Sequence, residues 1–406
     1  MRIGMVTACY KPVMNGVTRM VSLYKEKLEA EGHEVTVFTL GEPDPAGEEK
    51  NVLRSPAIPL GDTGYYFSFR YSKQAQERLR QMDIIHCHHL FMSVEMAHRY
   101  GNCPIVYTNH TRYDLYTGAY MPLPQPAADA IMRQVWPEFT DYCDVVITPS
   151  PSIRDIMREF GVRQRIEVIP NGIDLEPFWN PALSHTRDDF GIPEEAILLI
   201  YTGRLSSEKN LMKLLSQFAL AQDIVSDLHL LFMGKGPLKE KLQERAEELG
   251  LGQSVHFSGA VPYTEVGSIL ALADAYVTAS ISEVHPLSVI EGMATGLPVA
   301  AVSSPGIADT VEHNQTGLLT STPEGLAAAI TALVIDRQRC QAMGAAAREA
   351  SCRYDIDRTV QQTIELYEEL RRTRPDLQRE KGHGRWLRRQ AAPMLEQLGQ
   401  LLRPPE

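Results

Sequence analysis

The sequence predicts an α/β protein built from two doubly wound, Rossmann-like domains that face a central cleft. Three observations favour this fold class. The chain has 406 residues, 44 % of them hydrophobic and 22 % charged, and this length exceeds what one hydrophobic core usually organises. Short runs rich in Val and Ile alternate with longer amphipathic segments, as parallel strands alternate with crossover helices. The alternation restarts after the turn-forming cluster 170–174, so we expect two consecutive sheets.

The apolar runs give the expected strands in chain order. In the first half these are residues 2–7, 34–39, 84–86, 104–107, 145–148 and 166–169. In the second half they are residues 196–202, 228–233, 254–257, 275–278, 298–301 and 317–319. Helical spacing of apolar residues predicts a helix over 17–31 and a last regular helix at about 357–372. Sheets of this kind bind ligands beyond the carboxyl ends of their strands, so the loops that follow the strands are the candidate sites.

These elements divide the chain into an N-terminal domain at 1–172, a second domain at 173–352, a helix at 353–370 that we expect to pack back towards the first domain, and a tail at 371–406. The tail is basic and amphipathic. It has nine basic and four acidic side chains, a net charge of +5, which leaves −16 on residues 1–370 in a chain of net charge −11. The overall charge argues against a nucleic-acid-binding protein.

Hydropathy and cysteine spacing indicate the compartment. No stretch approaches the ~20 consecutive apolar residues that cross a bilayer, and an apolar strand follows Met1 almost directly, so we expect a cytoplasmic protein without a signal peptide. The six cysteines lack Cys-x-x-Cys spacing, which suits buried reduced thiols better than disulfides or a zinc site.

The loop 10–17 joins the first strand to the first helix. The free N–H groups at a helix N-terminus favour an anion, and Gly16 lets the backbone approach such a ligand closely. A glycine at this place can equally do no more than satisfy the turn. The loop lacks the Gly-x-Gly-x-x-Gly spacing of a dinucleotide site.

A second loop, 203–210, follows the strand at 196–202 and contains Arg204 and Lys209. Two cations at the carboxyl end of a strand suit a diphosphate, because arginine offers a fork of donors and lysine a compact charge. Taken alone, two such residues form a solvated surface pair more often than a binding site.

Two glutamates further along the chain strengthen the binding interpretation. Glu283 and Glu291 stand eight positions apart, flanking an apolar run that reads as the entry to a helix, with Glu291 about two turns in. Carboxylates suit hydroxyl-rich ligands, because each accepts two hydrogen bonds from a vicinal diol. The alternative is that Glu291 is a structural partner within the helix, since a buried glutamate needs some partner in either case.

In these residues the sequence resembles the retaining, nucleotide-sugar-dependent glycosyltransferases of family 4, which have the GT-B fold, and among them the diacylglycerol glucosyltransferase-like enzymes. The resemblance covers roughly residues 1–370. It rests on the order of six modest motifs: Asn15-Gly16-Val17, Pro170-Asn171-Gly172-Ile173-Asp174, Gly203-Arg204 with Glu208-Lys209, Gly234-Lys235-Gly236-Pro237, Glu283 to Glu291, and Gly317-Leu318-Leu319.

The resemblance implies a donor site. Arg204 and Lys209 would hold the donor diphosphate. Glu291 would bind the ribose hydroxyls, and Glu283 the hydroxyls of the transferred sugar. The further donor contacts that it implies are Gly16, Gly203, Leu287 and Ser288. It implies no cofactor and no divalent metal, because the two cations take the metal's role.

Histidines form the next group. His110 follows the strand at 104–107 and matches the family's histidine that contacts the donor sugar, so the resemblance assigns it a catalytic role together with Arg204, Lys209 and Glu283. His86, His88 and His89 have no carboxylate or cysteine at recognisable ligand spacing, so we interpret them as structural or as lining the cleft and expect no metal site.

The sequence also departs from the family pattern. Glu283-Val284-His285-Pro286 replaces the usual Glu-Gly-Phe-Gly, and Pro286 removes one possible backbone donor near the sugar. Asn15-Gly16 replaces Gly-Gly, and Glu291-Gly292 replaces Glu-Ala. Because no charged group is lost, the expected donor site is retained.

The expected reaction moves a hexose from a nucleotide sugar, UDP-glucose or a related UDP-sugar, to a lipid hydroxyl such as that of diacylglycerol. The family's retention of configuration implies front-face attack, with the leaving phosphate accepting the acceptor's proton. Electrostatic stabilisation by Arg204 and Lys209 would be the main catalytic effect.

The lipid acceptor is inferred from two segments besides the tail. The aromatic and basic segment 65–80 suits a membrane interface, and residues 108–120, with Tyr113 and Tyr116 as acceptor contacts, resemble the corresponding region of lipid-directed members. The tail adds an Arg cluster that anionic headgroups attract, so we expect a peripheral enzyme on the cytoplasmic face of an anionic membrane. The alternatives are a soluble sugar-phosphate or inositol acceptor, a nucleotide-sugar epimerase, and a non-catalytic binding module. The sequence leaves the donor base, the sugar and the oligomeric state open.

Overall fold

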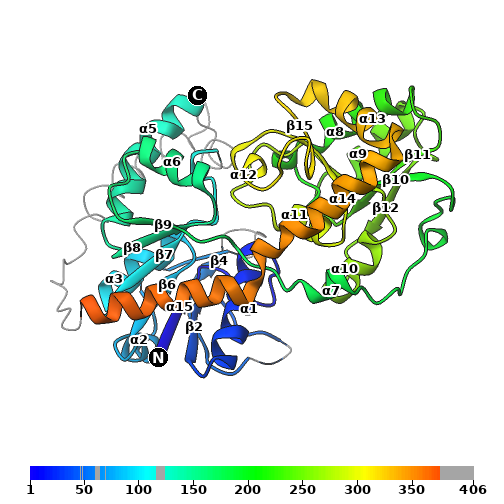
Figure 1. The fold of residues 1–406 in the computed structure, drawn as a ribbon. Helices are drawn as coiled ribbons and strands as arrows, with labels where there is room; N and C mark the ends of the chain where they lie inside the picture. Colours follow the sequence, from blue (N-terminus) through cyan, green and yellow to red (C-terminus); the bar gives the residue numbers. More distant parts are fainter. Residues whose placement is uncertain (46, 48, 60–64, 69, 116–123, 375–406) are drawn as a thin grey trace, which may run out of the picture.

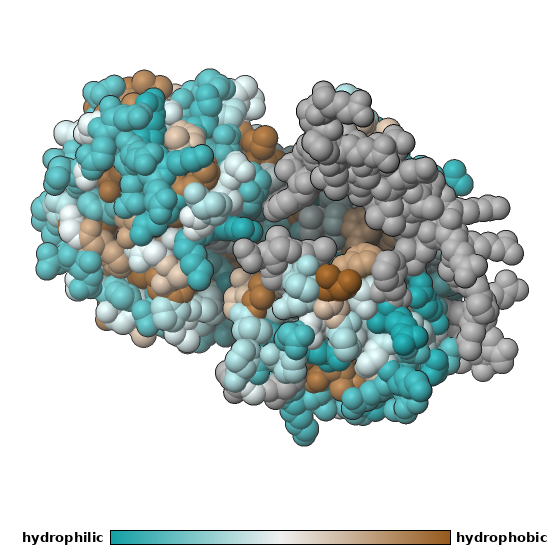
Figure 2. All heavy atoms as spheres, turned by 180° about the vertical axis from the view of Figure 1, so that it is seen from behind, coloured by the Kyte–Doolittle hydropathy of each residue, from teal (hydrophilic) through white to brown (hydrophobic). Residues whose placement is uncertain are grey.

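The computed structural model describes residues 1–45, 47, 49–59, 65–68, 70–115 and 124–374. They form two lobes, and each lobe contains one all-parallel sheet (Figure 1). The first sheet has the strand order β3-β2-β1-β6-β7-β8-β9, and the second has the order β12-β11-β10-β13-β14-β15. The predicted fold class, two Rossmann-like α/β domains, is confirmed. Figure 2 shows the lobes from behind, with a hollow where they meet.

The described residues of the N-terminal lobe form nine strands, of which two pair in a separate hairpin. The sheet strands are β1 (Arg2–Val6), β2 (Glu34–Leu40), β3 (Val52–Ser55), β6 (Ile84–Cys87), β7 (Ile105–Thr108), β8 (Val145–Thr148) and β9 (Ile166–Val168). The hairpin pairs β4 (Ile58–Pro59) with β5 (Tyr66–Phe67). The helices are α1 (Gly16–Ala30), α2 (Lys73–Leu79), α3 (Glu95–Tyr100), α5 (Gln125–Thr140) and α6 (Pro151–Glu159).

The C-terminal lobe repeats the same alternation. Its strands are β10 (Ile197–Thr202), β11 (Leu228–Met233), β12 (Val255–Gly259), β13 (Ala275–Thr278), β14 (Val299–Val302) and β15 (Gly317–Thr320). Its helices are α7 (Glu176–Trp179), α8 (Leu211–Gln222), α9 (Lys239–Glu248), α10 (Tyr263–Leu270), α11 (Leu287–Ala294), α12 (Pro305–Ala308), α13 (Leu326–Ile335) and α14 (Arg337–Ser351). The last helix of the chain is α15 (Ile356–Thr373).

Helices on both faces bury the strands, which explains their nearly continuous apolar runs. The central strands β6, β7, β8, β11, β13 and β14 are buried along their whole length. Helix α1 begins where the Asn15 side chain accepts a hydrogen bond from the Thr18 N–H at 2.9 Å, and it buries the predicted apolar positions Met20, Val21, Tyr24 and Leu28.

The observed elements differ from the expected ones in a few places. Strand β3 was not predicted, because its segment is short and mixes Arg54 and Ser55 with two apolar residues. Strands β7 and β14 each begin one residue later than expected, after Pro104 and Pro298, because proline has no N–H to donate to a sheet. Glu291 lies in the fifth position of α11, little more than one turn into the helix and not two.

The chain passes between the lobes at two adjacent places, which lie beside the predicted boundaries at 172 and 352. The Ile173 N–H donates to the Tyr354 carbonyl at 2.8 Å, and the Ile356 N–H donates back to the Ile173 carbonyl at 3.0 Å. A Cβ on Gly172 would lie 2.5 Å from the Ile356 Cα, so this close approach requires glycine. The two crossings therefore hold each other in place.

After the second crossing, α15 lies along the N-terminal lobe (Figure 1). Val360, Ile364 and Tyr367 pack into the same apolar cluster as α1 and β1. The lobes also touch at α6, where the N–H and the hydroxyl of Ser152 donate to the Asp309 carboxylate, both at 2.9 Å. The lobes are thus joined by both crossings, by α15 and by this polar contact.

No helix among the described residues is both long enough and apolar enough to cross a bilayer. Five of the cysteines are buried free thiols, in agreement with the expectation. The expectation is wrong for Cys352, which is exposed because it lies at the end of α14, where the chain leaves the lobe.

Candidate functional site

The residues predicted to bind a diphosphate lie at the carboxyl edge of the second sheet. Strand β10 leads into the loop with Arg204 and Lys209, and β13 leads into the loop with Glu283. The two strands are paired neighbours, with Leu199 opposite Ala275, so their loops lie side by side. This is the edge at which open α/β sheets bind ligands.

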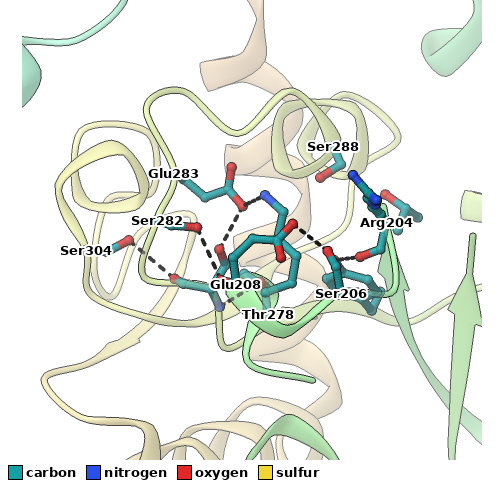
Figure 3. Close-up of polar contacts among 12 residues, drawn as sticks. Arg204, Ser206, Glu208, Thr278, Ser282, Glu283, Ser288 and Ser304 are labelled. Carbon is teal, nitrogen blue, oxygen red and sulfur yellow. Dashed lines mark hydrogen bonds and ion pairs between the residues drawn. The ribbon is translucent and has the colours of Figure 1, made fainter. Parts of the chain in front are cut away.

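Lys209 and Glu283 form an ion pair in this site. The Lys209 Nζ lies 2.6 Å from Oε1 of Glu283, and the Ser280 hydroxyl donates to the same oxygen at 2.8 Å (Figure 3). The two side chains are 19 % and 18 % exposed, so each keeps a face open to a ligand. Burial opposes ionisation of Glu283, but the charge of Lys209 and its hydrogen bonds outweigh burial and hold the pKa of this carboxyl below its usual value.

Arg204 and the start of α11 lie on the other side of the site, with Ser288 near Arg204 in the close-up (Figure 3). Arg204 is exposed and makes no ion pair with the described residues. The N–H groups of Leu287 and Ser288 donate to no described residue, while the Ser288 hydroxyl accepts from Tyr276 at 3.0 Å. A guanidinium beside unpaired N–H groups at a helix N-terminus is suited to an anion.

Glycines fix the shape of the loop that carries Arg204. A Cβ on Gly234 would lie 1.9 Å from the Gly203 carbonyl oxygen, and both glycines have a positive φ, +147° and +144°. The close approach lets the Gly203 N–H donate to the Met233 carbonyl at 3.0 Å. Gly203 therefore sets the path of the loop, whatever further contact it makes with a ligand.

The N-terminus of α1 belongs to the first domain. Gly16 is exposed, and a Cβ there would meet nothing within 4 Å. Asn15 caps the helix through Thr18, and the N–H groups of Gly16 and Val17 donate to no described residue. These free donors agree with the expected anion-binding role of Gly16, and the open space leaves room for a ligand.

Glu291 has a partner that the sequence did not suggest. Its Oε1 accepts from Nη1 of Arg19 on α1 at 2.5 Å, which makes an ion pair between the two domains. Burial raises the pKa of Glu291, and Arg19 offsets only part of this effect. A basic residue in the first turn of a helix opposes the helix dipole, so the position of Arg19 was a signal that it has an acidic partner elsewhere.

His110 is half-buried and lies next to a buried histidine. Its Nε2 is 3.1 Å from the Nδ1 of His88, and the two rings stack with centroids 5.4 Å apart. Burial lowers the pKa of His110 to about 3, and nearby histidines, His285 among them, add to the shift. His110 is therefore neutral at physiological pH and can exchange hydrogen bonds with a sugar without carrying charge.

The neighbouring histidines are held by the protein. His86 lies between the Tyr367 hydroxyl at 2.5 Å and the Thr108 hydroxyl at 2.6 Å, and His89 lies 3.1 Å from the Thr7 hydroxyl. His285 is buried against the Tyr354 ring, and its Nδ1 makes no hydrogen bond with described residues. The described part of the chain contains no group of three or more His, Cys, Asp or Glu that could hold a metal ion.

The expected acceptor contacts are only partly described. Tyr113 packs edge-to-face against Phe91 and Trp136, and its hydroxyl accepts from the Leu90 N–H at 3.1 Å. Tyr116 lies outside the described residues, as does the tail from 375 onwards. The roles of Tyr113 and Tyr116 in acceptor binding stay predictions.

Each half of the chain matches a known protein family. Residues 14–177 match the family described as Glycosyltransferase Family 4, and residues 184–350 match the family described as Glycosyl transferases group 1. The alpha-monoglucosyldiacylglycerol synthase of Streptococcus pneumoniae is 30 % identical over 82 % of this chain and 78 % of its own length. The protein of the same name from Acholeplasma laidlawii is 27 % identical over 86 % of this chain and 92 % of its own.

Solved structures support the same assignment of the fold. Sucrose-phosphate synthase from Thermosynechococcus elongatus superimposes with a TM-score of 0.74, covering 92 % of this chain and 99 % of its own at 22 % identity. Anabaena HepE, solved in complex with UDP-glucose, gives a TM-score of 0.72 over 91 % of this chain and all of its own at 20 % identity. The two-domain arrangement is the GT-B fold, and the chain belongs to the glycosyltransferases that join a family 4 domain to a group 1 domain.

Proposed function

We propose that the protein transfers a hexose from a UDP-sugar, UDP-glucose being the expected donor, to a lipid hydroxyl such as that of diacylglycerol. The observation that carries the donor half is the juxtaposition of Arg204, the Lys209–Glu283 pair and the free N–H groups at the start of α11. A diphosphate needs cations and N–H donors, and a sugar needs carboxylate acceptors. This edge of the sheet offers all three.

In the proposed reaction the acceptor oxygen bonds to the anomeric carbon on the face from which the diphosphate leaves. The bond between that carbon and the phosphate oxygen breaks, and the acceptor's proton passes to the departing phosphate. The anomeric configuration is retained, and UDP is released. No enzymatic base is needed, and His110, whose pKa burial lowers to about 3, would be a weak one.

Charge development on the leaving diphosphate is the step at which the protein acts. Arg204, Lys209 and the backbone of Leu287, Ser288 and Gly16 would stabilise that charge. Such preorganised donors commonly contribute several kcal/mol to lowering a barrier. In this proposal the two cations supply the charge that a divalent metal supplies in other transferases. The donor's ribose would bind to Glu291, and its sugar to Glu283 and His110.

The lipid acceptor is supported by the names of two relatives that match over 82 % and 86 % of the chain, both of them alpha-monoglucosyldiacylglycerol synthases. The N-terminal lobe also exposes apolar side chains at Met14 and Ile58, which are 61 % and 66 % exposed. Tyr71, in the aromatic segment, is instead buried and belongs to the core. A peripheral enzyme on the cytoplasmic face of an anionic membrane, held by the basic tail, fits this acceptor.

A soluble acceptor is the second candidate. The D-inositol 3-phosphate glycosyltransferase of Corynebacterium urealyticum is 30 % identical over 61 % of this chain and 61 % of its own length. The two candidates predict different products, so one experiment separates them.

That experiment incubates the purified protein with UDP-, GDP- and ADP-sugars, each with a panel of membrane lipids and soluble sugar phosphates or inositols. Mass spectrometry reads the products. We expect a hexosyl lipid from a UDP-sugar. Transfer to a soluble acceptor alone would overturn the lipid proposal. An epimerised donor in the absence of acceptor would indicate an epimerase, and no turnover at all would indicate a binding module.

Membrane attachment has its own test. Truncation after Arg374 removes the remaining tail but keeps the ion pair between Arg374 and Asp144. We expect the truncated protein to lose sedimentation with anionic vesicles and turnover of lipid acceptors while still binding UDP. Unchanged co-sedimentation with vesicles would contradict the proposal that the tail attaches the protein to the membrane.

A further inference from the structure

Arg19 of the first domain contacts Glu291 in the expected nucleoside site of the second domain. It lies in the first turn of α1, and its Nη1 donates to Oε1 of Glu291 on α11 at 2.5 Å. The Arg19 side chain is 21 % exposed and that of Glu291 only 6 %. The pair is therefore largely shielded from water, where a charge-assisted hydrogen bond is strong.

A second contact holds the guanidinium in place. The Cζ of Arg19 lies 3.2 Å from the ring centroid of Tyr263, the first residue of α10. The planar guanidinium thus stacks on one element of the second domain while it donates to another. Arginine suits this combination, because it can stack on a ring and donate in its own plane at the same time.

The contact with Arg19 uses only one of the two carboxylate oxygens of Glu291. Arg19 uses Oε1, and Oε2 accepts no hydrogen bond from a described residue. A carboxylate held by one oxygen presents its other oxygen in a fixed direction. That oxygen can accept from the hydroxyls of a vicinal diol while the pair with Arg19 stays intact.

We propose that Arg19 is a positioning residue for the donor's nucleoside: an arginine of the N-terminal domain holds Glu291 by one oxygen, so that the other receives the ribose hydroxyls. This inference rests on the proposed function, in which Glu291 binds the ribose. It makes nucleoside recognition depend on both domains, because the partner of Glu291 is in place only when the domains are arranged as observed.

The charge state of Glu291 gives the proposal a distinctive signature. Burial raises the pKa of Glu291, and Arg19 on α1 is the charge that opposes this shift. Without Arg19 the carboxyl takes up a proton at higher pH and loses an acceptor for the ribose. Nucleoside binding should then weaken further as the pH falls towards 6.

The test measures binding of UDP and of inorganic pyrophosphate to the full chain by calorimetry at pH 6, 7 and 8. The variants are Arg19→Gln, Arg19→Lys, Glu291→Gln and the double variant Arg19→Gln/Glu291→Gln. The matched control is Arg2→Gln, which removes an arginine of the same domain whose partner is Asp83. Thermal unfolding of each variant reports whether it folds.

We expect Arg19→Gln to weaken UDP binding about tenfold at pH 7, the loss typical of one charged hydrogen bond, and by more at pH 6. Pyrophosphate binding should not change, because it has no ribose. Arg19→Lys should recover part of the loss. The double variant should bind UDP about as weakly as Glu291→Gln alone, because Arg19 acts through Glu291.

Two results would overturn the inference while leaving the proposed function intact. One is unchanged or tighter UDP binding by a folded Arg19→Gln variant. The other is an equal loss of UDP and pyrophosphate binding. If the wild-type protein binds none of UDP, GDP and ADP, the proposed function fails, and the inference fails with it.

Discussion

The two glutamates of the candidate site are each paired with a cation, but the pairs are built differently. Glu283 and its partner Lys209 both belong to the second domain, at 2.6 Å, while Glu291 is paired across the domain boundary with Arg19 at 2.5 Å. The pKa of Glu283 is lowered, and that of Glu291 is raised. The two ion pairs thus have similar lengths, but the pKa values of their carboxyl groups are shifted in opposite directions.

The difference arises from the surroundings. Ser280 adds a hydrogen bond to Glu283, whereas Glu291 sits among the apolar residues of α11 with a single donor. The first pair is therefore complete within one domain and suited to a fixed role at the reacting sugar. The second depends on how the two domains are arranged, which suits a role in recognising the nucleoside.

The largest expected effect comes from breaking the pair within one domain. Lys209→Ala should lower kcat/KM about 100- to 1000-fold, because it removes a cation from the leaving diphosphate and leaves Glu283 unpaired. Steady-state kinetics with the preferred donor measures this. Lys213→Ala is the matched control, since Lys213 pairs with Glu324 at the surface, and it should change little. A loss below tenfold for Lys209→Ala would contradict the assigned role.

As the pH falls, the free energy of unfolding should decrease first through the buried histidines around the site and only at lower pH through Glu283. Burial lowers the pKa of His86, His110 and His285 to about 3 in the folded protein, against about 6.5 when unfolded. Between these values the unfolded state binds more protons. The free energy of unfolding should therefore fall as the pH drops below 6.5, by ~1.4 kcal/mol per pH unit for each such histidine.

Chemical denaturation between pH 7 and pH 5 measures this slope. His285→Phe removes one of these buried histidines and should make the slope shallower. A stability that stays constant over this range would contradict the buried, neutral state of these histidines.

The smallest expected effect concerns the polar contact between the domains. Asp309→Ala removes the acceptor for the Ser152 N–H and hydroxyl at the start of α6 and should cost ~1 kcal/mol, as the loss of a helix cap does. Differential scanning calorimetry measures the shift in Tm. Asp155→Ala is the control, because Asp155 pairs at the surface with its neighbour Arg154. An equal effect of both variants would show that the contact does not hold the domains together.

Much of this architecture could be predicted from the sequence. The buried strands are apolar runs, and the loops after β10 and β13 carry the charged residues from which the site was predicted. The structure brings Arg204, Lys209, Glu283 and the start of α11 together as neighbouring strands require.

What the sequence did not show depends on contacts between distant segments. Arg19 and Glu291 are separated by 272 positions, so no local pattern reveals that they meet. Strand β3 has too few apolar residues to stand out and is defined by its pairing with β2. Cys352 is exposed because of where α14 ends relative to the lobe, which composition does not indicate.

The most direct test of the proposed reaction is the anomeric configuration of its product. The purified protein is incubated with UDP-glucose and diacylglycerol in anionic vesicles, and the glycolipid is analysed by NMR. The proposal predicts a glucosyl lipid with the α configuration of the donor, formed in equal amount with UDP. A β-linked product, or UDP release without any glycolipid, would contradict it.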